Sequence, residues 1–416
     1  MDKRDFLRGA GVATLGLVLG PDALAEQTAA PAAGLAGDER YWSALRAKFR
    51  LRDEYINLEN GYYCFQPEEV LEAFVGHVRS LNFEASHYMR TRRDEDRVEI
   101  RARLAAFVGC SRDELIVTRN TTESLDTVIS GFDWKPGDEA VMANQDYGAM
   151  LDMFRLQAQR HGIRNRLIDI PVDPASDADV VAAYAREMTP RTRLLMIPHI
   201  VNITGHVLPV RSICEMAHAR GVPVMVDGAH AVAHLDFKIS DLGCDFYGAS
   251  LHKWLAAPLG AGLLYVRRDR IRDLWPIFAD STVAADDIRK LNHTGTHPEH
   301  TPLTISRAIE FHESIGSARK EARLRFLQQY WTSQLRGRRG IVLSSPSDPA
   351  RCCAIATVGI ESVPPARLAE SLLRDYRVYT VAIDSAGVRG VRVTPQVFTS
   401  TTELDVLVRA LRELSA

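Results

Sequence analysis

Short apolar runs alternate with amphipathic stretches from about residue 114 to residue 266. The runs are rich in β-branched residues, and the stretches at 123–130, 150–161, 178–188 and 210–220 have helical spacing. This alternation predicts an α/β fold with a doubly wound, mostly parallel, seven-stranded sheet. Only residues 250–261 separate the last two runs, too few for a typical crossover helix, so we expect the final strand to run antiparallel. The runs lie at 115–117, 140–142, 167–170, 194–197, 222–226, 246–249 and 262–266.

A different pattern begins after residue 305. A long helical stretch at 306–334 precedes three apolar runs, and two further helical stretches lie among these runs. This pattern predicts a smaller α+β C-terminal domain at 306–416, which shares the long helix with a large domain at 39–305. The runs are 353–358, 376–381 and 388–394, with helices at 365–375 and 403–414; the large domain begins with helices at 40–49, 68–84 and 94–107 and a short strand at 56–63.

Composition limits the classes of partner. The chain has 416 residues and a net charge of -2, with 46% hydrophobic and 25% charged residues, values typical of a globular protein. A balance so close to neutral favours neither nucleic acid nor an anionic membrane as a partner. The six cysteines show no spacing typical of a metal site or a disulfide framework.

The first 38 residues are expected to lie outside the fold. Residues 2–8 are basic, residues 9–20 are weakly apolar, and residues 23–25 form a small-x-small cleavage site, which together predict a signal peptide at 1–25. Lys3-Arg4 is similar to the twin-arginine export signal, with lysine in place of the first arginine. We therefore expect a periplasmic mature protein without a membrane span, preceded by a linker at 26–38. An ordinary secretory signal or a disordered tail is the alternative.

An acid and an amine stand at the ends of neighbouring apolar runs. Asp227 closes the run 222–226, and Lys253 follows the run 246–249. The carboxyl ends of neighbouring strands of one sheet face the same crevice, so the two side chains are expected to meet. The pair suits pyridoxal 5'-phosphate (PLP), because a lysine forms a Schiff base with its aldehyde and a carboxylate holds a proton on its pyridine nitrogen. Beside a cation, Asp227 is expected to have a lowered pKa.

The order and spacing of these motifs resemble the class V aminotransferase family of fold-type I PLP enzymes. The likeness runs from about residue 56 to the C-terminus and is strongest over Val-Asp-Gly-Ala-His-Ala at 226–231 and Gly-Ala-Ser-Leu-His-Lys-Trp at 248–254. The family includes isopenicillin N epimerase-like proteins, the subgroup that this chain resembles, with cysteine desulfurases and kynureninase. The resemblance implies that Lys253 forms an aldimine with PLP and then moves a substrate proton through a quinonoid.

The resemblance also implies a phosphate cup. Thr121 and Thr122 open a helix after the first run of the sheet, where backbone N–H groups and hydroxyls can bind an anion. Ser250 and His252, next to Lys253, complete the cup in the family pattern. Taken alone, the two threonines would be an ordinary helix N-cap.

Three residues are implied to surround the cofactor ring. Tyr147 lies where the family stacks an aromatic ring or histidine on the pyridine, although a loop tyrosine is an alternative. Asn202 and His230 match positions near the phenolic oxygen. Their alternatives are a turn residue before Gly205 and a core histidine.

The substrate site is implied to lie beside the C-terminal domain. Arg392 matches the family arginine that forks onto the substrate carboxylate, with Arg389 as a competing candidate. Asn60, Gly61 and Tyr62 are implied to line the mouth of the pocket.

The resemblance further implies a homodimer with shared active sites. Thr296, in Thr294-Gly295-Thr296, would complete the phosphate site of the other subunit. A flexible loop is the alternative for this segment.

The reaction type stays open between several PLP chemistries. A cysteine desulfurase needs a mobile cysteine shortly before the substrate arginine, and residues 376–392 contain none. The leading hypothesis is an enzyme that acts on the amino group of an amino acid or peptide-like substrate, tailoring an exported metabolite such as a siderophore. The alternatives are an isopenicillin N epimerase-like epimerase, a C–S or β-lyase on a small amino acid, and a non-catalytic binding protein.

Overall fold

The computed structural model describes residues 32–416. The predicted signal peptide and the first six residues of the predicted linker lie outside this range. The rest of that linker is built into the protein, because α2 (Ala32–Leu35) ends at a buried leucine whose carbonyl oxygen accepts the Trp42 indole N–H at 2.7 Å. In the described part of the chain, no helix combines the length and the apolar character needed to span a bilayer.

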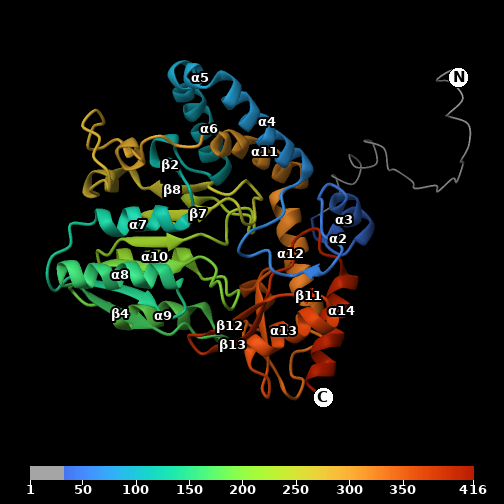
Figure 1. Ribbon diagram of the computed structural model, residues 1–416. Helices are drawn as coiled ribbons and strands as arrows, with labels where there is room; N and C mark the ends of the chain where they lie inside the picture. Colours follow the sequence, from blue (N-terminus) through green and yellow to red (C-terminus); the bar gives the residue numbers. More distant parts are fainter. Residues whose placement is uncertain (1–31) are drawn as a thin grey trace, which may run out of the picture.

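A seven-stranded sheet forms the centre of the large domain (Figure 1). Its strand order is β2-β8-β7-β6-β5-β3-β4, and all neighbouring strands are parallel except β8, which is antiparallel to both β7 and β2. The predicted fold class and the antiparallel final strand are confirmed. The strands are β2 (Leu115–Thr118), β3 (Glu139–Ala143), β4 (Arg164–Ile168), β5 (Thr192–Pro198), β6 (Val224–Asp227), β7 (Phe246–Ser250) and β8 (Gly262–Val266).

Both faces of this sheet are covered, which explains why its strands have nearly continuous apolar sequences. Along β5, Leu194 and Met196 pack into one hydrophobic cluster with α7 (Thr121–Gly131) and α8 (Gly148–His161). The alternate residues of β5 pack into a second cluster with α9 (Asp177–Glu187) and α10 (Val210–His218). Figure 1 shows α7 and α8 lying along the sheet. The burial of both faces therefore holds the strand ends in place.

The C-terminal domain contains a four-stranded antiparallel sheet of order β12-β13-β10-β9 with its own apolar cluster. The predicted single helix at 306–334 is wrong, because Gly316 adopts φ +89°, a conformation that glycine tolerates, and separates two helices. These helices are α11 (His300–Ile315) and α12 (Ser317–Thr332); the other elements are β9 (Ile341–Leu343), β10 (Ala356–Ile360), α13 (Pro365–Tyr376), β11 (Val378–Tyr379), β12 (Val381–Ser385), β13 (Val388–Val393) and α14 (Thr401–Leu414).

The N-terminal segment bridges the two domains. Its short strand β1 (Ile56–Asn57) pairs in parallel with β11 of the C-terminal domain. Its helices α4 and α6 pack against α11, whose buried apolar residues belong to the core cluster of the large sheet. The sequence pattern did not predict α5 (Ser86–Thr91), which is short and lies between two longer helices. The remaining helices of the segment are α3 (Glu39–Arg46), α4 (Glu68–Glu84) and α6 (Arg93–Val108).

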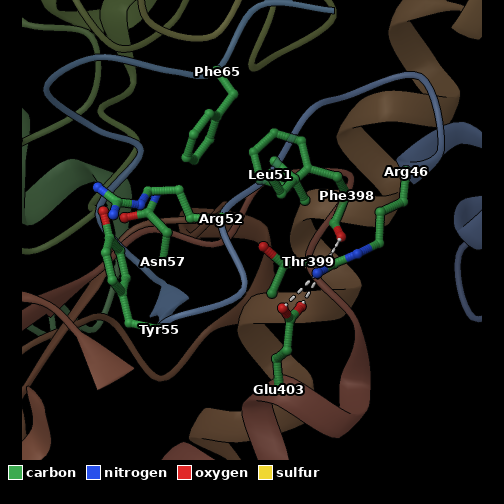
Figure 2. Close-up of a pocket in the computed structure, with 9 residues that line it drawn as sticks. All are labelled: Arg46, Leu51, Arg52, Tyr55, Asn57, Phe65, Phe398, Thr399 and Glu403. Atoms are coloured by element: carbon green, nitrogen blue, oxygen red, sulfur yellow. Dashed lines mark hydrogen bonds and ion pairs between the residues drawn. The ribbon is translucent and has the colours of Figure 1, made fainter. Parts of the chain in front are cut away.

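A very small cavity marks the contact between this segment and the start of α14 (Figure 2). Arg46 donates to the carbonyl oxygen of Phe398 at 2.6 Å and pairs with Glu403 at 2.8 Å. The cavity of about 10 Å³ has room for about one water molecule. We therefore assign it to the packing of the two segments.

Candidate active site

A cavity of about 260 Å³ lies at the carboxyl edge of the large sheet. β6 ends at Asp227 and its neighbour β7 ends at Ser250, so both residues reach the edge where open α/β sheets bind ligands. β13 of the C-terminal domain contributes Arg392 to the cavity wall. All the site residues predicted from the sequence line this cavity except Asn60 and Thr296.

The predicted acid and amine both reach the cavity. Asp227 is only 9% exposed, and its Oδ1 accepts the Ala229 N–H at 2.9 Å. The expected lowering of the Asp227 pKa is wrong: burial raises it, and this outweighs the opposite effects of the Ala229 N–H and Lys253. Burial also lowers the pKa of Lys253 to about 8. The site thus holds an acid that needs a cationic partner and an amine that loses its proton readily.

The end of β7 and the start of α7 form a polar cup. The Thr121 N–H donates to Ser250 Oγ at 2.9 Å, and the two hydroxyl oxygens lie 2.7 Å apart. Burial lowers the pKa of His252 to about 4, and its Nδ1 is buried without a hydrogen-bond partner among the described residues. Thr122 lines the same cavity. Hydroxyls at a helix N-terminus with an unpartnered imidazole nitrogen fit a phosphate group.

Of the three residues predicted to surround the cofactor ring, His230 is the one that contacts Lys253 directly. Its Nε2 lies 3.2 Å from Lys253 Nζ, and burial together with Lys253 and Arg392 places the pKa of His230 well below its usual value. Tyr147 precedes α8 and is 47% exposed, and Asn202 accepts a hydrogen bond from Arg392 through its main-chain oxygen at 3.3 Å. All three residues line the cavity, and His230 is brought directly to the amine.

Sequence reasoning missed the partner of Arg392. Glu59 forms a two-pronged ion pair with it, at 2.7 Å to Nη2 and 3.2 Å to Nε. Both side chains are nearly fully buried, so the acid fixes the guanidinium while the remaining N–H groups face other partners. The competing candidate Arg389 pairs instead with Asp384 on the surface. In the sequence, the only indication of this ion pair was that Glu59 directly precedes Asn60, the first predicted residue of the pocket mouth.

Asn60 supports the cavity without lining it. It is fully buried, its N–H donates to Thr394 Oγ1 at 2.7 Å, and its side-chain amide donates to the Thr394 carbonyl oxygen at 2.8 Å. These bonds hold the N-terminal segment against the end of β13. Gly61 and Tyr62 follow directly and reach the cavity, as predicted.

Thr296 lies in a different cavity of about 600 Å³. The structure therefore does not bring Thr296 together with the other predicted site residues of its own chain. Arginines from α6 and from the 280–297 segment share this second cavity, namely Arg93, Arg97, Arg101 and Arg289.

None of the six cysteines lines the 260 Å³ cavity. The N–H of Cys64 donates to the carbonyl oxygen of His252, a cavity residue, at 3.2 Å, and burial raises the pKa of the Cys64 thiol to about 11. Burial raises the pKa of the Cys352 thiol to about 12. A thiol with a raised pKa is a poor nucleophile near neutral pH.

The sequence matches a family model that explains this geometry. Residues 65–410 match the family described as aminotransferase class-V. The chain belongs to the class V aminotransferase family. It is a fold-type I enzyme, and its cofactor is pyridoxal 5'-phosphate.

This chain is similar to curated isopenicillin N epimerases and cysteine desulfurases. The isopenicillin N epimerase of Streptomyces clavuligerus is 28% identical over 394 residues, which cover 90% of this chain and 98% of that protein. The isopenicillin N epimerase of Amycolatopsis lactamdurans is 32% identical over 337 residues, 76% of this chain and 84% of that protein. A probable cysteine desulfurase of Xylella fastidiosa is 28% identical over 321 residues, 71% of this chain and 75% of that protein.

Solved structures share the fold of this class V family member. A C-DES mutant with glycine covalently linked to its PLP cofactor superposes with a TM-score of 0.79 at 21% identity, over 88% of this chain and 98% of that chain. The cysteine desulfurase CsdA of Escherichia coli gives 0.77 at 24% identity, over 89% and 98% of the two chains. At these identities, the two structures show that the fold is shared.

The cavity of this chain fits PLP on its own chemistry. Asp227 would hold the pyridine nitrogen, since its buried carboxyl has a raised pKa and gains from a cation. Lys253 would bind the aldehyde carbon, because its lowered pKa makes the neutral amine available. The cup would hold the phosphate, through Thr121, Thr122, Ser250 and His252.

Proposed function

We propose that this enzyme is an epimerase that inverts the α-carbon of an amino acid-type substrate. The observation that carries the proposal is its likeness to two isopenicillin N epimerases, at 32% identity over 84% of one and 28% over 98% of the other. These relatives favour epimerisation over the broader expectation of a metabolite-tailoring enzyme. The substrate would be an amino acid or a peptide-like molecule with a free carboxylate.

The residues of the cavity can each serve this reaction. PLP, when bound, supplies an electron sink that stabilises negative charge on the substrate α-carbon. Arg392 would hold the substrate carboxylate through N–H groups that Glu59 does not use. Lys253 would take the α-proton as a neutral amine and give a proton back, which leaves the composition of the substrate unchanged.

The cavity favours this activity over cysteine desulfuration. A desulfurase transfers sulfur to a protein thiolate, and no cysteine among the described residues lines the cavity. A C–S or β-lyase needs no protein thiol, so it is the alternative that the experiment must separate. Product analysis distinguishes a lyase from an epimerase, because elimination releases a fragment of the substrate and epimerisation does not.

Assembly and location are parts of the same proposal. We propose a homodimer in which Thr296 serves the phosphate site of the other subunit, since it lies away from the cavity of its own chain. Export to the periplasm through residues 1–25 is a further proposal, tested by locating the mature protein after cell fractionation. A siderophore or another exported metabolite would then be a substrate class to try.

The test is product analysis with the PLP-loaded enzyme. Single-enantiomer amino acids and short peptides, including cysteine, cystine and isopenicillin N, are incubated with the enzyme and with Lys253→Ala as the control. We expect the opposite epimer, with loss of the α-proton signal in D2O, and no sulfide, ammonia or 2-oxo acid. Release of sulfide or ammonia together with a 2-oxo acid would assign a lyase, and a 2-oxo acid formed without ammonia would assign an aminotransferase.

A further inference from the structure

Trp254, which follows Lys253 in the chain, connects the amine to two buried histidines. Its indole is fully buried and stacks on the His234 ring, with centroids 3.7 Å apart and planes 25° from parallel. Its Nε1–H donates to His230 Nδ1 at 3.3 Å. The ammonium of Lys320 donates to the main-chain oxygen of Trp254, so the backbone next to Lys253 is fixed as well.

The hydrogen bonds determine where the proton of each histidine lies. The Ala354 N–H donates to His234 Nε2 at 3.0 Å, so His234 carries its proton on Nδ1, which lies 2.7 Å from the carbonyl oxygen of His230. Burial keeps both imidazoles neutral by holding their pKa values well below the usual range. Each ring therefore has one N–H and one acceptor nitrogen.

The same reasoning determines which ring nitrogen of His230 carries the proton. Because Nδ1 accepts from Trp254, the single proton of His230 lies on Nε2, 3.2 Å from Lys253 Nζ. An Nε2–H needs a lone pair to accept it. A neutral amine has one lone pair and an ammonium group has none. If Lys253 were protonated, its ammonium N–H and the His230 Nε2–H would be two donors facing each other. Otherwise His230 would have to move its proton to Nδ1 and lose the hydrogen bond from Trp254.

We propose that Trp254 is a positioning residue: it fixes the Nε2–H tautomer of His230, which donates to Lys253 and favours the neutral form of that amine over the charged one. The neutral amine is the form that binds an aldehyde and accepts a proton. A second consequence concerns proton transfer. His230 cannot accept the proton that Lys253 takes up, because its Nε2 already carries one. This second consequence rests on the proposed function, whereas the hydrogen-bond arrangement does not.

The other charges around Lys253 do not depend on Trp254. Asp227 and Glu59 favour the protonated amine, and Arg392 opposes it. His252 and His234 face His230 and are neutral, since burial lowers the pKa of each. The indole contacts neutral His234, where phenylalanine would keep a ring, but none of the charged groups, so a change in the Lys253 titration would report the tautomer of His230.

The experiment titrates Lys253 in the full-length protein freed of PLP. The chain has only seven lysines, so isotope labelling of lysine gives few NMR signals, and the Lys253→Ala variant identifies the one of interest. Trp254→Phe removes the N–H and keeps a ring against His234. We expect it to raise the pKa of Lys253 by about one unit, a tenfold change in the protonation equilibrium that corresponds to one hydrogen bond.

The control is Trp331→Phe. Trp331 is also fully buried, and its Nε1 has no hydrogen-bond partner among the described residues, so the same substitution removes no such bond. Its Lys253 titration should match that of the wild type. In a His230→Gln background, Trp254→Phe should produce no further shift. The proposal would be overturned if Trp254→Phe left the pKa of Lys253 unchanged. It would also be overturned if Trp254→Phe shifted that pKa equally in the His230→Gln background.

A second measurement needs no tryptophan variant to fold. Nitrogen-15 correlations of the histidine rings in the PLP-free wild type, recorded at about pH 9.5 so that Lys253 with its pKa of about 8 is neutral, show which nitrogen of His230 is protonated. A proton on Nε2 supports the proposal, and a proton on Nδ1 or on both nitrogens overturns it. Neither measurement uses a substrate, so the result stands apart from the outcome of the epimerase assay.

Discussion

Replacing Lys253 by methionine should stabilise the PLP-free protein while removing its Schiff-base residue. Burial lowers the pKa of Lys253 from 10.5 to about 8. The unfolded chain then binds more protons than the folded protein between these two values, so the free energy of unfolding rises with pH across this window. Below pH 8, the charged amine in the cavity lowers the free energy of unfolding by at most about 3 kcal/mol, which is the pKa difference multiplied by 1.36 kcal/mol per pKa unit. Lys253→Met removes this cost and retains an unbranched side chain of similar length.

The assay is urea unfolding of PLP-free wild type and Lys253→Met at two pH values. At pH 7, the variant should be more stable by about 2–3 kcal/mol, and the difference should fall to about 1 kcal/mol near pH 9.5. Lys320 titrates in the same window but is present in both proteins, so it cancels from the comparison. A variant that is less stable at pH 7, or a difference that does not change with pH, would refute the argument.

Three further predictions concern residues that line the cavity or lie next to residues that line it. Glu59→Gln should lower the free energy of unfolding by about 2 kcal/mol, because its buried arginine partner loses the counter-charge; Asp384→Asn, at a surface pair, should change it by less than about 0.5 kcal/mol in the same urea titration. Ser250→Ala should weaken PLP binding about tenfold in a fluorescence titration, whereas the exposed control Ser240→Ala should not, and equal affinities would contradict the phosphate cup. Cys64→Ala should leave turnover within about threefold, and a loss above a hundredfold would indicate thiol catalysis.

The sequence alone determined the architecture of the large domain. Runs of apolar residues separated by amphipathic stretches reflect strands buried on both faces, and the short 250–261 connection was enough to predict that β8 runs antiparallel. The same pattern placed Asp227 and Lys253 at one sheet edge, because the ends of neighbouring strands must lie together. Local periodicity was less informative at Gly316, where one backbone conformation divides a continuous helical pattern.

Tertiary structure decided the finer properties of the site. Glu59 and Arg392 are 333 positions apart, and only the packing of the N-terminal segment on β13 makes them a buried ion pair. The raised pKa of Asp227 follows from its depth, which a strand-end position does not reveal. The tautomer of His230 depends on the indole of Trp254 and thus on how two separate segments pack. Hydrophobic periodicity is a local property of a chain, whereas desolvation and hydrogen-bond partners arise only when distant segments meet.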